Sequence, residues 1–131
     1  YLNKKSGVAG ISGLSSDMRD IEAADKAGMP KAVLAMSMYS YKIKKYIGAY
    51  TAALGGVDVI VFTGGVGENQ IGLRAQICKE LAFMGIELDE KANDTKGEEI
   101  VITTPNSKVK VVVVPTDEEF MIASDTIALI Q

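Results

Sequence analysis

Apolar residues recur at three- and four-residue spacing from residue 30 to residue 54. This spacing is typical of one face of an α-helix, so a helix is predicted from Pro30 to about Leu54, ended by the glycines that follow. The stripe consists of Met36, Tyr39, Ile43, Tyr46 or Ile47, Tyr50 and Leu54. Three further side chains lie off it: Leu34, Met38 and Tyr41. The helix is therefore expected to be covered on more than one side.

A continuous apolar run from Val57 to Thr63 is bounded by glycines. A short run of this kind predicts a central strand that is buried on both faces. After it, Leu73, Ile77 and Leu81 share one helical face and predict a helix to about Met84. Two strands are predicted at residues 100–103 and 109–114, because the turn formers at 105–107 separate them.

Shorter elements complete the expected order. Ser15 or Ser16 can cap a helix that runs to about residue 27, after an irregular or partly helical start at residues 1–15. Residues 85–88 fit a short edge strand, and the polar residues 89–99 fit a solvent-facing loop. Thr116 and Glu119 form a capping box that opens the last helix. Strands alternating with helices in this way predict an α/β fold.

Composition limits the classes of function. The chain has 131 residues, which suits one domain or part of one, and its net charge is −3. Its 14 lysines and arginines are mostly scattered, which argues against a nucleic-acid-binding surface. The apolar runs are too short to span a membrane, and no signal peptide is visible. The single cysteine, Cys78, excludes an internal disulfide, favours a reducing cytoplasm and fits an inert buried thiol.

The chain contains no histidine, so Ser–His or Cys–His nucleophilic chemistry cannot be completed within it. It begins at Tyr1 with a polar run, which suggests a segment of a longer protein. The tyrosine-rich helix is expected to belong to the core, with a subunit interface as the alternative.

The glycine-rich stretch from Gly64 to Asn69 follows the apolar run and precedes a helix. Glycines there allow a phosphate to approach the backbone N–H groups closely. A tight turn without a ligand is the alternative interpretation. Gln70 stands where a dinucleotide fingerprint needs glycine, and no Gly-Lys-Ser/Thr sequence supplies a P-loop.

Two more segments contain residues that could bind a ligand or a metal ion. Residues 15–20, Ser-Ser-Asp-Met-Arg-Asp, taken alone favour a capped surface helix. Residues 115–119, Pro-Thr-Asp-Glu-Glu, favour helix capping. Only Glu119 is needed for that box, so Asp117 and Glu118 are free to bind magnesium, which prefers hard oxygen ligands.

Together these segments resemble a known family. Residues 12–22, 61–69 and 115–119 occur in the order and spacing of the C-terminal part of the acetate and propionate kinase family, and residues 2–7 are also similar. The resemblance covers essentially all 131 residues. It implies a single partial domain at residues 1–131, belonging to the C-terminal ribonuclease-H-like ATPase domain of the superfamily of actin, Hsp70 and the sugar kinases.

The resemblance also implies site residues. The nucleotide-binding residues implied are Asp17, Met18, Arg19, Gly65, Val66, Gly67, Glu68 and Asn69. Glu118 matches the family's magnesium-site glutamate, so Mg²⁺ is expected with ATP or ADP. Asp117 stands where many members carry asparagine, a departure that leaves Glu118 aligned.

The family's reaction transfers a phosphoryl group between ATP and acetate, giving acetyl phosphate and ADP. Such transfer needs positioning and charge neutralisation more than covalent chemistry from the protein. In the family the acetate pocket, a histidine and two arginines lie in the N-terminal two-thirds, so the 131 residues alone are expected to be inactive. A cytoplasmic homodimer is expected, with acetate and acetyl phosphate bound through that missing part. A propionate or other short-chain carboxylate kinase and a non-catalytic nucleotide-binding or dimerisation module stay open.

Overall fold

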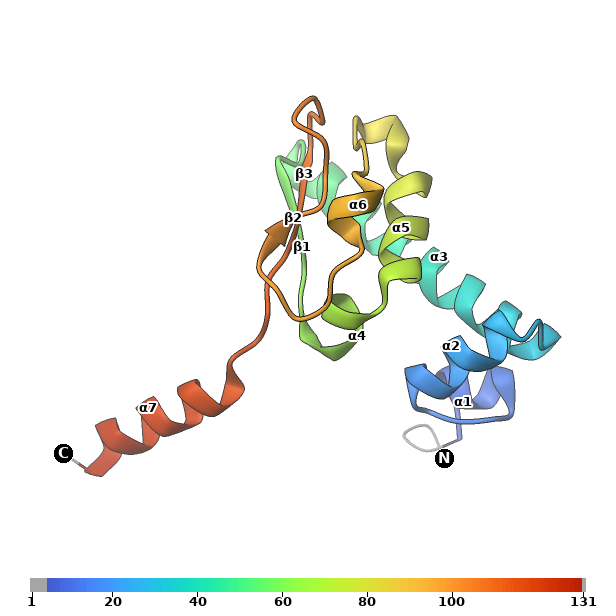
Figure 1. The fold of residues 1–131 in the computed structure, drawn as a ribbon, viewed down its shortest axis with the longest axis horizontal. Coiled ribbons are helices and arrows are strands. Elements are labelled where there is room, and N and C mark those ends of the chain that lie inside the picture. Colours follow the sequence, from blue (N-terminus) through green and yellow to red (C-terminus); the bar gives the residue numbers. More distant parts are fainter. Residues whose placement is uncertain (1–4, 131) are drawn as a thin grey trace.

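The computed structural model describes residues 5–130, and the first predicted segment lies partly outside this range. The elements are α1 Gly7–Ser12, α2 Met18–Lys26, α3 Pro30–Leu54, β1 Val59–Phe62, α4 Gly64–Asn69, α5 Ile71–Glu80, the 3₁₀ helix η1 Ala82–Met84, α6 Glu90–Asn93, β2 Ile100–Val101, β3 Lys110–Val113 and α7 Glu118–Ile130 (Figure 1). The predicted α/β class is confirmed, because helices alternate along the chain with the strands of a three-stranded mixed sheet.

Helix α3 has the predicted bounds. Pro30 occupies its first turn, and Gly55 ends it with a φ of 75°, a conformation that glycine adopts without strain. Its buried face, which includes Ala32, Ala35 and Met36, lies where α1, α2 and α5 contact the helix. The expected cover on a second side is wrong for the described residues, since the off-stripe side chain of Leu34 is 53% exposed. Apolar periodicity predicted the helix but not what covers its other faces.

The sheet has the strand order β1–β3–β2, with β1 parallel and β2 antiparallel to β3. The prediction of a central strand for residues 57–63 is wrong, because β1 lies at an edge of the described sheet. One face is buried and carries Phe62 and Val113, which are register partners. The other face leaves Val59 50% and Val61 53% exposed. The strand has apolar residues on both faces, but the described residues cover only one.

The predicted strands at 100–103 and 109–114 are present but shorter, and they pair as expected. Residues 85–88 form only an isolated bridge, Leu88 to Thr103, in place of an edge strand. The polar stretch 89–99 is not a simple solvent-facing loop, because it contains α6 with the buried Asn93. Asn93 is buried because it bonds the Arg74 side chain, a partner that the local sequence does not reveal.

Two helix caps differ from expectation. Asp17, rather than Ser15 or Ser16, caps α2 by accepting a hydrogen bond from the Arg19 amide at 2.9 Å. At α7, Asp117 takes the role expected of Thr116 and accepts from the amide of Phe120 at 3.0 Å. Aspartate is as good a cap as serine or threonine, so local propensity could not separate these neighbours.

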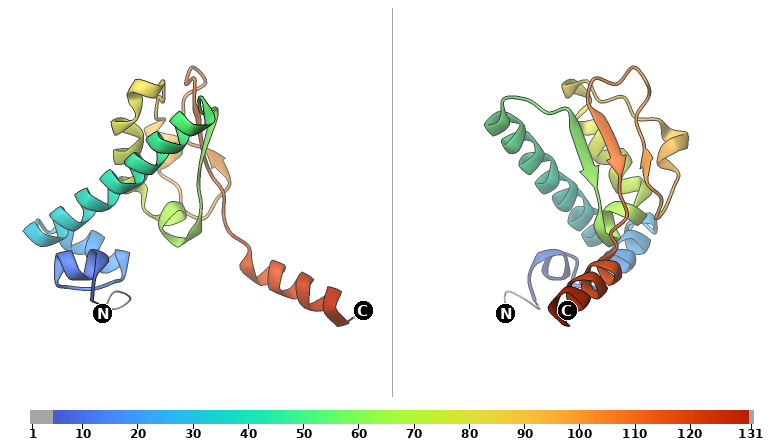
Figure 2. Two further views of the ribbon diagram at one scale, coloured as in Figure 1. Left: turned by 180° about the vertical axis from the view of Figure 1, so that it is seen from behind. Right: turned by 90° about the vertical axis from the view of Figure 1, so that its left-hand side faces the viewer.

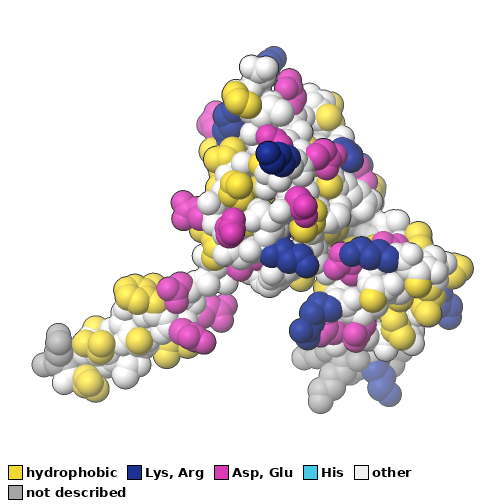
Figure 3. Space-filling view, viewed as in Figure 1, with side chains coloured by type: hydrophobic (Ala, Val, Ile, Leu, Met, Phe, Trp, Pro, Cys, Tyr) yellow, Lys and Arg dark blue, Asp and Glu magenta, His cyan; other side chains and the backbone are white. Residues whose placement is uncertain are grey.

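Helix α7 projects away from the rest of the molecule (Figures 1 and 2). Its apolar side chains are exposed, and yellow patches mark them along the projecting arm in Figure 3. They are Phe120, Met121, Ile122, Ile127, Leu129 and Ile130. Within residues 5–130, no helix combines the length and the apolarity that crossing a membrane would require.

The exposed apolar face of α7 leads us to expect self-association of the 131-residue chain. Leu129 is 87% exposed, and contiguous apolar surface of this kind favours contact between copies. We expect Leu129→Glu to weaken association about tenfold in sedimentation equilibrium, because a carboxylate cannot be buried cheaply. Ser124→Glu adds the same charge at a polar position of α7 and is the control. A monomeric profile of the unmodified chain at high concentration would contradict this expectation.

Candidate functional site

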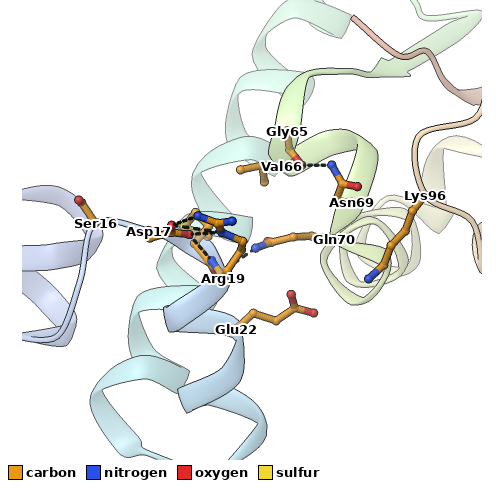
Figure 4. A pocket seen from close by; sticks show the side chains of 10 residues that line it. Ser16, Asp17, Arg19, Glu22, Gly65, Val66, Asn69, Gln70 and Lys96 are labelled. Atoms are coloured by element: carbon orange, nitrogen blue, oxygen red, sulfur yellow. Dashed lines mark hydrogen bonds and ion pairs between the residues drawn. The ribbon is translucent and has the colours of Figure 1, made fainter.

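A cleft of about 730 Å³ lies between the start of α2 and the α4–α5 segment (Figure 4). The residues that line it are Ser16, Asp17, Met18, Arg19, Glu22, Gly65, Val66, Asn69, Gln70 and Lys96. The structure thus brings together two of the three segments that the sequence singled out, although more than 40 residues separate them. Of the predicted nucleotide residues, Gly67 and Glu68 do not line this cleft.

One wall of the cleft carries an ion pair between Arg19 and Asp17. The Arg19 guanidinium donates through Nε and Nη2 to both carboxylate oxygens of Asp17, with Nε at 3.0 and 3.1 Å. These bonds lower the pKa of Asp17 to about 2. Because the Arg19 side chain is 88% exposed, its planar face remains accessible to a ligand while the pair fixes its direction.

The opposite wall is α4, which the sequence predicted only as a glycine-rich turn. Gly64 has a φ of 70°, so the chain turns from β1 into the helix with a conformation that suits glycine. Gly67 is buried, and a Cβ atom there would lie 3.2 Å from the carbonyl carbon of Phe62. A Cβ at Gly65 would meet no atom within 4 Å. Gly67 therefore serves packing, whereas Gly65 leaves open space in the cleft.

The Asn69 side chain closes α4 locally, since its Nδ2 donates to the Gly65 carbonyl at 2.8 Å. Gln70, at the junction with α5, is 4% exposed and donates through Nε2 to the Met18 carbonyl at 3.0 Å. This bond joins the two walls directly. Gln70 Oε1 is buried and has no hydrogen-bond partner among the described residues.

Arg74 holds α4 from behind and is fully buried. Its Nη1 donates to the carbonyls of Gly67 and Glu68 at 2.9 and 2.8 Å. Its Nε and Nη2 donate to Asn93 Oδ1 at 2.9 Å and to the carbonyls of Asn93 and Thr95 at 2.8 Å. Burial lowers the pKa of the guanidinium. Arg74 therefore connects α4 to the end of α6. Its bond to the Thr95 carbonyl also holds the loop that contains Lys96.

Sequence reasoning assigned no role to Gln70, Arg74 or Lys96. Arg74 left one signal, because it falls between Leu73 and Ile77 on the buried face of α5, where a cation is unexpected. Gln70 and Lys96 left none, since only the fold brings them to the cleft. The predicted burial of Cys78 is confirmed, and burial raises its pKa to about 11.

Glu68 and Glu118 lie outside the cleft. Glu68 Oε1 accepts from the amide and the hydroxyl of Thr116 at 2.9 and 3.0 Å, which places the third sequence segment beside α4. These bonds lower the pKa of Glu68. Glu118 follows in the first turn of α7. Within residues 5–130, no three acidic or cysteine side chains gather closely enough to hold a metal ion, so Glu118 offers a single carboxylate.

Comparison with known proteins identifies the family. The Acetokinase family model matches residues 1–124. The acetate kinase of Phocaeicola vulgatus is 64% identical over 129 residues, which are 98% of this chain and 32% of that protein. The crystal structure of Porphyromonas gingivalis acetate kinase superimposes with a TM-score of 0.89 at 61% identity, covering 99% of this chain and 33% of that one.

A propionate kinase structure from Francisella tularensis also matches, with a TM-score of 0.82 at 37% identity, covering 93% of this chain and 31% of that one. The chain belongs to the Acetokinase family, whose acetate kinases are phosphotransferases. It has the α/β fold of part of an acetate kinase and spans about a third of the length of the relatives it matches.

Proposed function

We propose that this chain is the C-terminal, nucleotide-binding part of an acetate kinase, which transfers a phosphoryl group between ATP and acetate. The observation that carries the proposal is the cleft, because it joins Asp17, Met18 and Arg19 to Gly65, Val66 and Asn69. A cleft with an exposed guanidinium on one wall and an open backbone on the other suits a nucleotide. Identity above 60% to several acetate kinases supports the same activity.

In this proposal the residues of the chain bind the nucleotide and orient it. Arg19, held by Asp17, lies against the nucleotide, and the lack of a side chain at Gly65 lets the ligand approach α4 closely. Gly67 and Glu68 belong to the same helix and keep it in place. The groups that bind acetate and act on the transferred phosphoryl group belong to a part of the protein outside these 131 residues.

Magnesium fits this arrangement through Glu118. The ion is commonly held by one or two carboxylates together with phosphate oxygens and water, so a single exposed glutamate is an adequate protein contribution. When bound, magnesium neutralises charge on the phosphates. Glu118 supplies an oxygen ligand, and its place at the start of α7 is set by the segment that leaves β3.

The proposal extends to the whole protein. The 131 residues form one partial domain within the C-terminal ribonuclease-H-like ATPase domain, and the protein acts in the cytoplasm as a homodimer. Acetate is proposed as the acceptor because relatives at 58–64% identity are acetate kinases. A propionate or other short-chain carboxylate kinase is the alternative, because the acceptor pocket lies outside these residues. A non-catalytic nucleotide-binding or dimerisation module is the second candidate, favoured by the exposed apolar face of α7.

Calorimetric titration with ADP and magnesium tests the cleft. We expect the chain to bind ADP and Arg19→Ala to lose about tenfold in affinity, since one charged, pre-oriented contact is worth about 1.4 kcal/mol. Lys45→Ala removes an exposed cation of α3 that does not line the cleft and is expected to bind normally. Absence of heat from the unmodified chain and the variant alike would leave only the non-catalytic interpretation. Equal affinities would remove Arg19 from the site.

A further inference from the structure

Glu68 differs from its neighbours on α4. Gly65, Val66 and Asn69 line the cleft, whereas Glu68 does not. Its carboxylate instead meets Thr116, 48 residues further along the chain. A residue that belongs to the nucleotide-binding helix but is directed at another segment calls for a role other than contact with the nucleotide.

The bond pattern between Glu68 and Thr116 is specific. One carboxylate oxygen, Oε1, accepts from both the backbone amide and the hydroxyl of Thr116, at 2.9 and 3.0 Å. Two donors on one residue fix both the position and the rotation of that residue, which a single bond would not. Glu68 forms no ion pair among the described residues, and besides Thr116 its carboxylate interacts with the backbone N–H of Gly64 on α4 itself.

The segment that Thr116 begins has few other attachments. Val114 ends the sheet region by donating its amide to the Phe62 carbonyl at 2.9 Å. Beyond it, the hydrogen bonds described for residues 115–130 are internal to that segment, apart from the two that Glu68 accepts. The Asp117 cap then sets the first turn of α7, in which Glu118 lies.

We propose that Glu68 is a positioning residue, which holds Thr116 through two hydrogen bonds and thereby places Glu118 relative to the nucleotide cleft. The inference rests on the proposed function in two respects, namely that the nucleotide contacts α4 and that Glu118 ligates its magnesium ion. Glu68 thus connects the helix that contacts the nucleotide to the residue that contacts its metal. A nucleotide that moves α4 then also moves the metal ligand.

The link itself is tested by following the Thr116 amide in NMR spectra of the 131-residue chain across pH. The Thr116 signal is expected to titrate with a midpoint below 4.5, the ordinary pKa of glutamate, because the two bonds favour the charged carboxylate. The bonds are present above that midpoint and are lost as the pH falls through it. Glu68→Gln identifies Glu68 as the source of this transition by removing it. An unchanged transition in Glu68→Gln would overturn the proposal.

Thr116 and a distant pair provide matched controls. Thr116→Ser keeps both donors and is expected to preserve the low midpoint, whereas Thr116→Val keeps only the amide and is expected to raise the Glu68 midpoint. Thr104 donates its hydroxyl to Glu87 at 3.0 Å in a similar exposed pair remote from the cleft. Glu87→Gln is therefore expected to leave the Thr116 signal unaltered.

The consequence for the metal is tested by ADP affinity with and without magnesium. We expect magnesium to strengthen ADP binding to the unmodified chain. Glu68→Leu removes the acceptor oxygen and is expected to reduce that gain about fivefold while metal-free affinity stays unchanged. Equal loss with and without magnesium would make Glu68 a nucleotide contact and overturn the proposal. No ADP binding by the unmodified chain would instead refute the proposed function, and the Thr116 titration would still decide whether Glu68 holds Thr116.

Discussion

Replacing Arg74 with methionine is expected to lower the free energy of unfolding by about 4 kcal/mol, as measured by urea denaturation. Methionine fills a similar volume but donates no hydrogen bond. The change leaves five acceptors on three segments without their donor, among them the carbonyls of Gly67 and Thr95. Several of these are buried, and each unsatisfied buried acceptor costs about 1–3 kcal/mol.

Arg74→Lys distinguishes the contribution of the positive charge to stability from that of the guanidinium geometry. Lysine keeps the positive charge, but its three donors on one nitrogen cannot reach acceptors that surround a planar guanidinium, so only a small part of the stability is expected to return. Arg19→Met is the matched control, because Arg19 is the other arginine of the chain and its side chain is 88% exposed. That variant is expected to lose little stability, because an exposed ion pair contributes little. A similar loss of stability in Arg74→Met and Arg19→Met would contradict the structural role assigned to Arg74.

Placing leucine at Gly65 is expected to weaken ADP binding by at least about tenfold without lowering stability. A Cβ at this position meets no protein atom within 4 Å, so the folded chain accommodates it. The longer side chain then occupies space in the cleft that the proposed ligand needs. Calorimetric titration with ADP measures the affinity, and urea denaturation measures the stability of the same preparation.

Gly67→Ala is the matched change on the same helix. It is expected to lower the stability of the fold rather than to block ADP directly. Its Cβ would lie 3.2 Å from a backbone carbon of Phe62, so α4 must shift, and stability is expected to fall by about 1 kcal/mol. The effect on ADP is then secondary to that shift. Unchanged ADP affinity in Gly65→Leu would show that the cleft beside α4 is not the nucleotide site.

Local patterns predicted much of the fold. The bounds of α3 followed from a proline, a glycine and an apolar stripe between them, all of which act within a few residues. The cleft joins residues 16–19 to residues 65–70, two segments that the family resemblance implied for one nucleotide site. Cap identity was less well predicted, because Ser16 and Asp17 offer the α2 amides equivalent acceptors and only the final geometry selects one.

Long-range contacts could not be predicted in this way. Both arginines are on helices, yet Arg19 is exposed beside the cleft and Arg74 is buried behind it. The difference arises because the partners of Arg74 come from α4, α6 and Thr95, and the sequence alone does not say that these segments surround one guanidinium.

The sequence by itself determined the longer helices, the three strands and the family resemblance, because periodicity, capping residues and motif spacing are properties of neighbouring residues. It did not reveal the short helices α4 and α6. Only the tertiary structure decided that β1 lies at a sheet edge and that Glu68 is directed at Thr116. The reason is physical. Apolar residues on both faces of a strand favour burial of each face, but which segments cover those faces depends on how the whole chain packs.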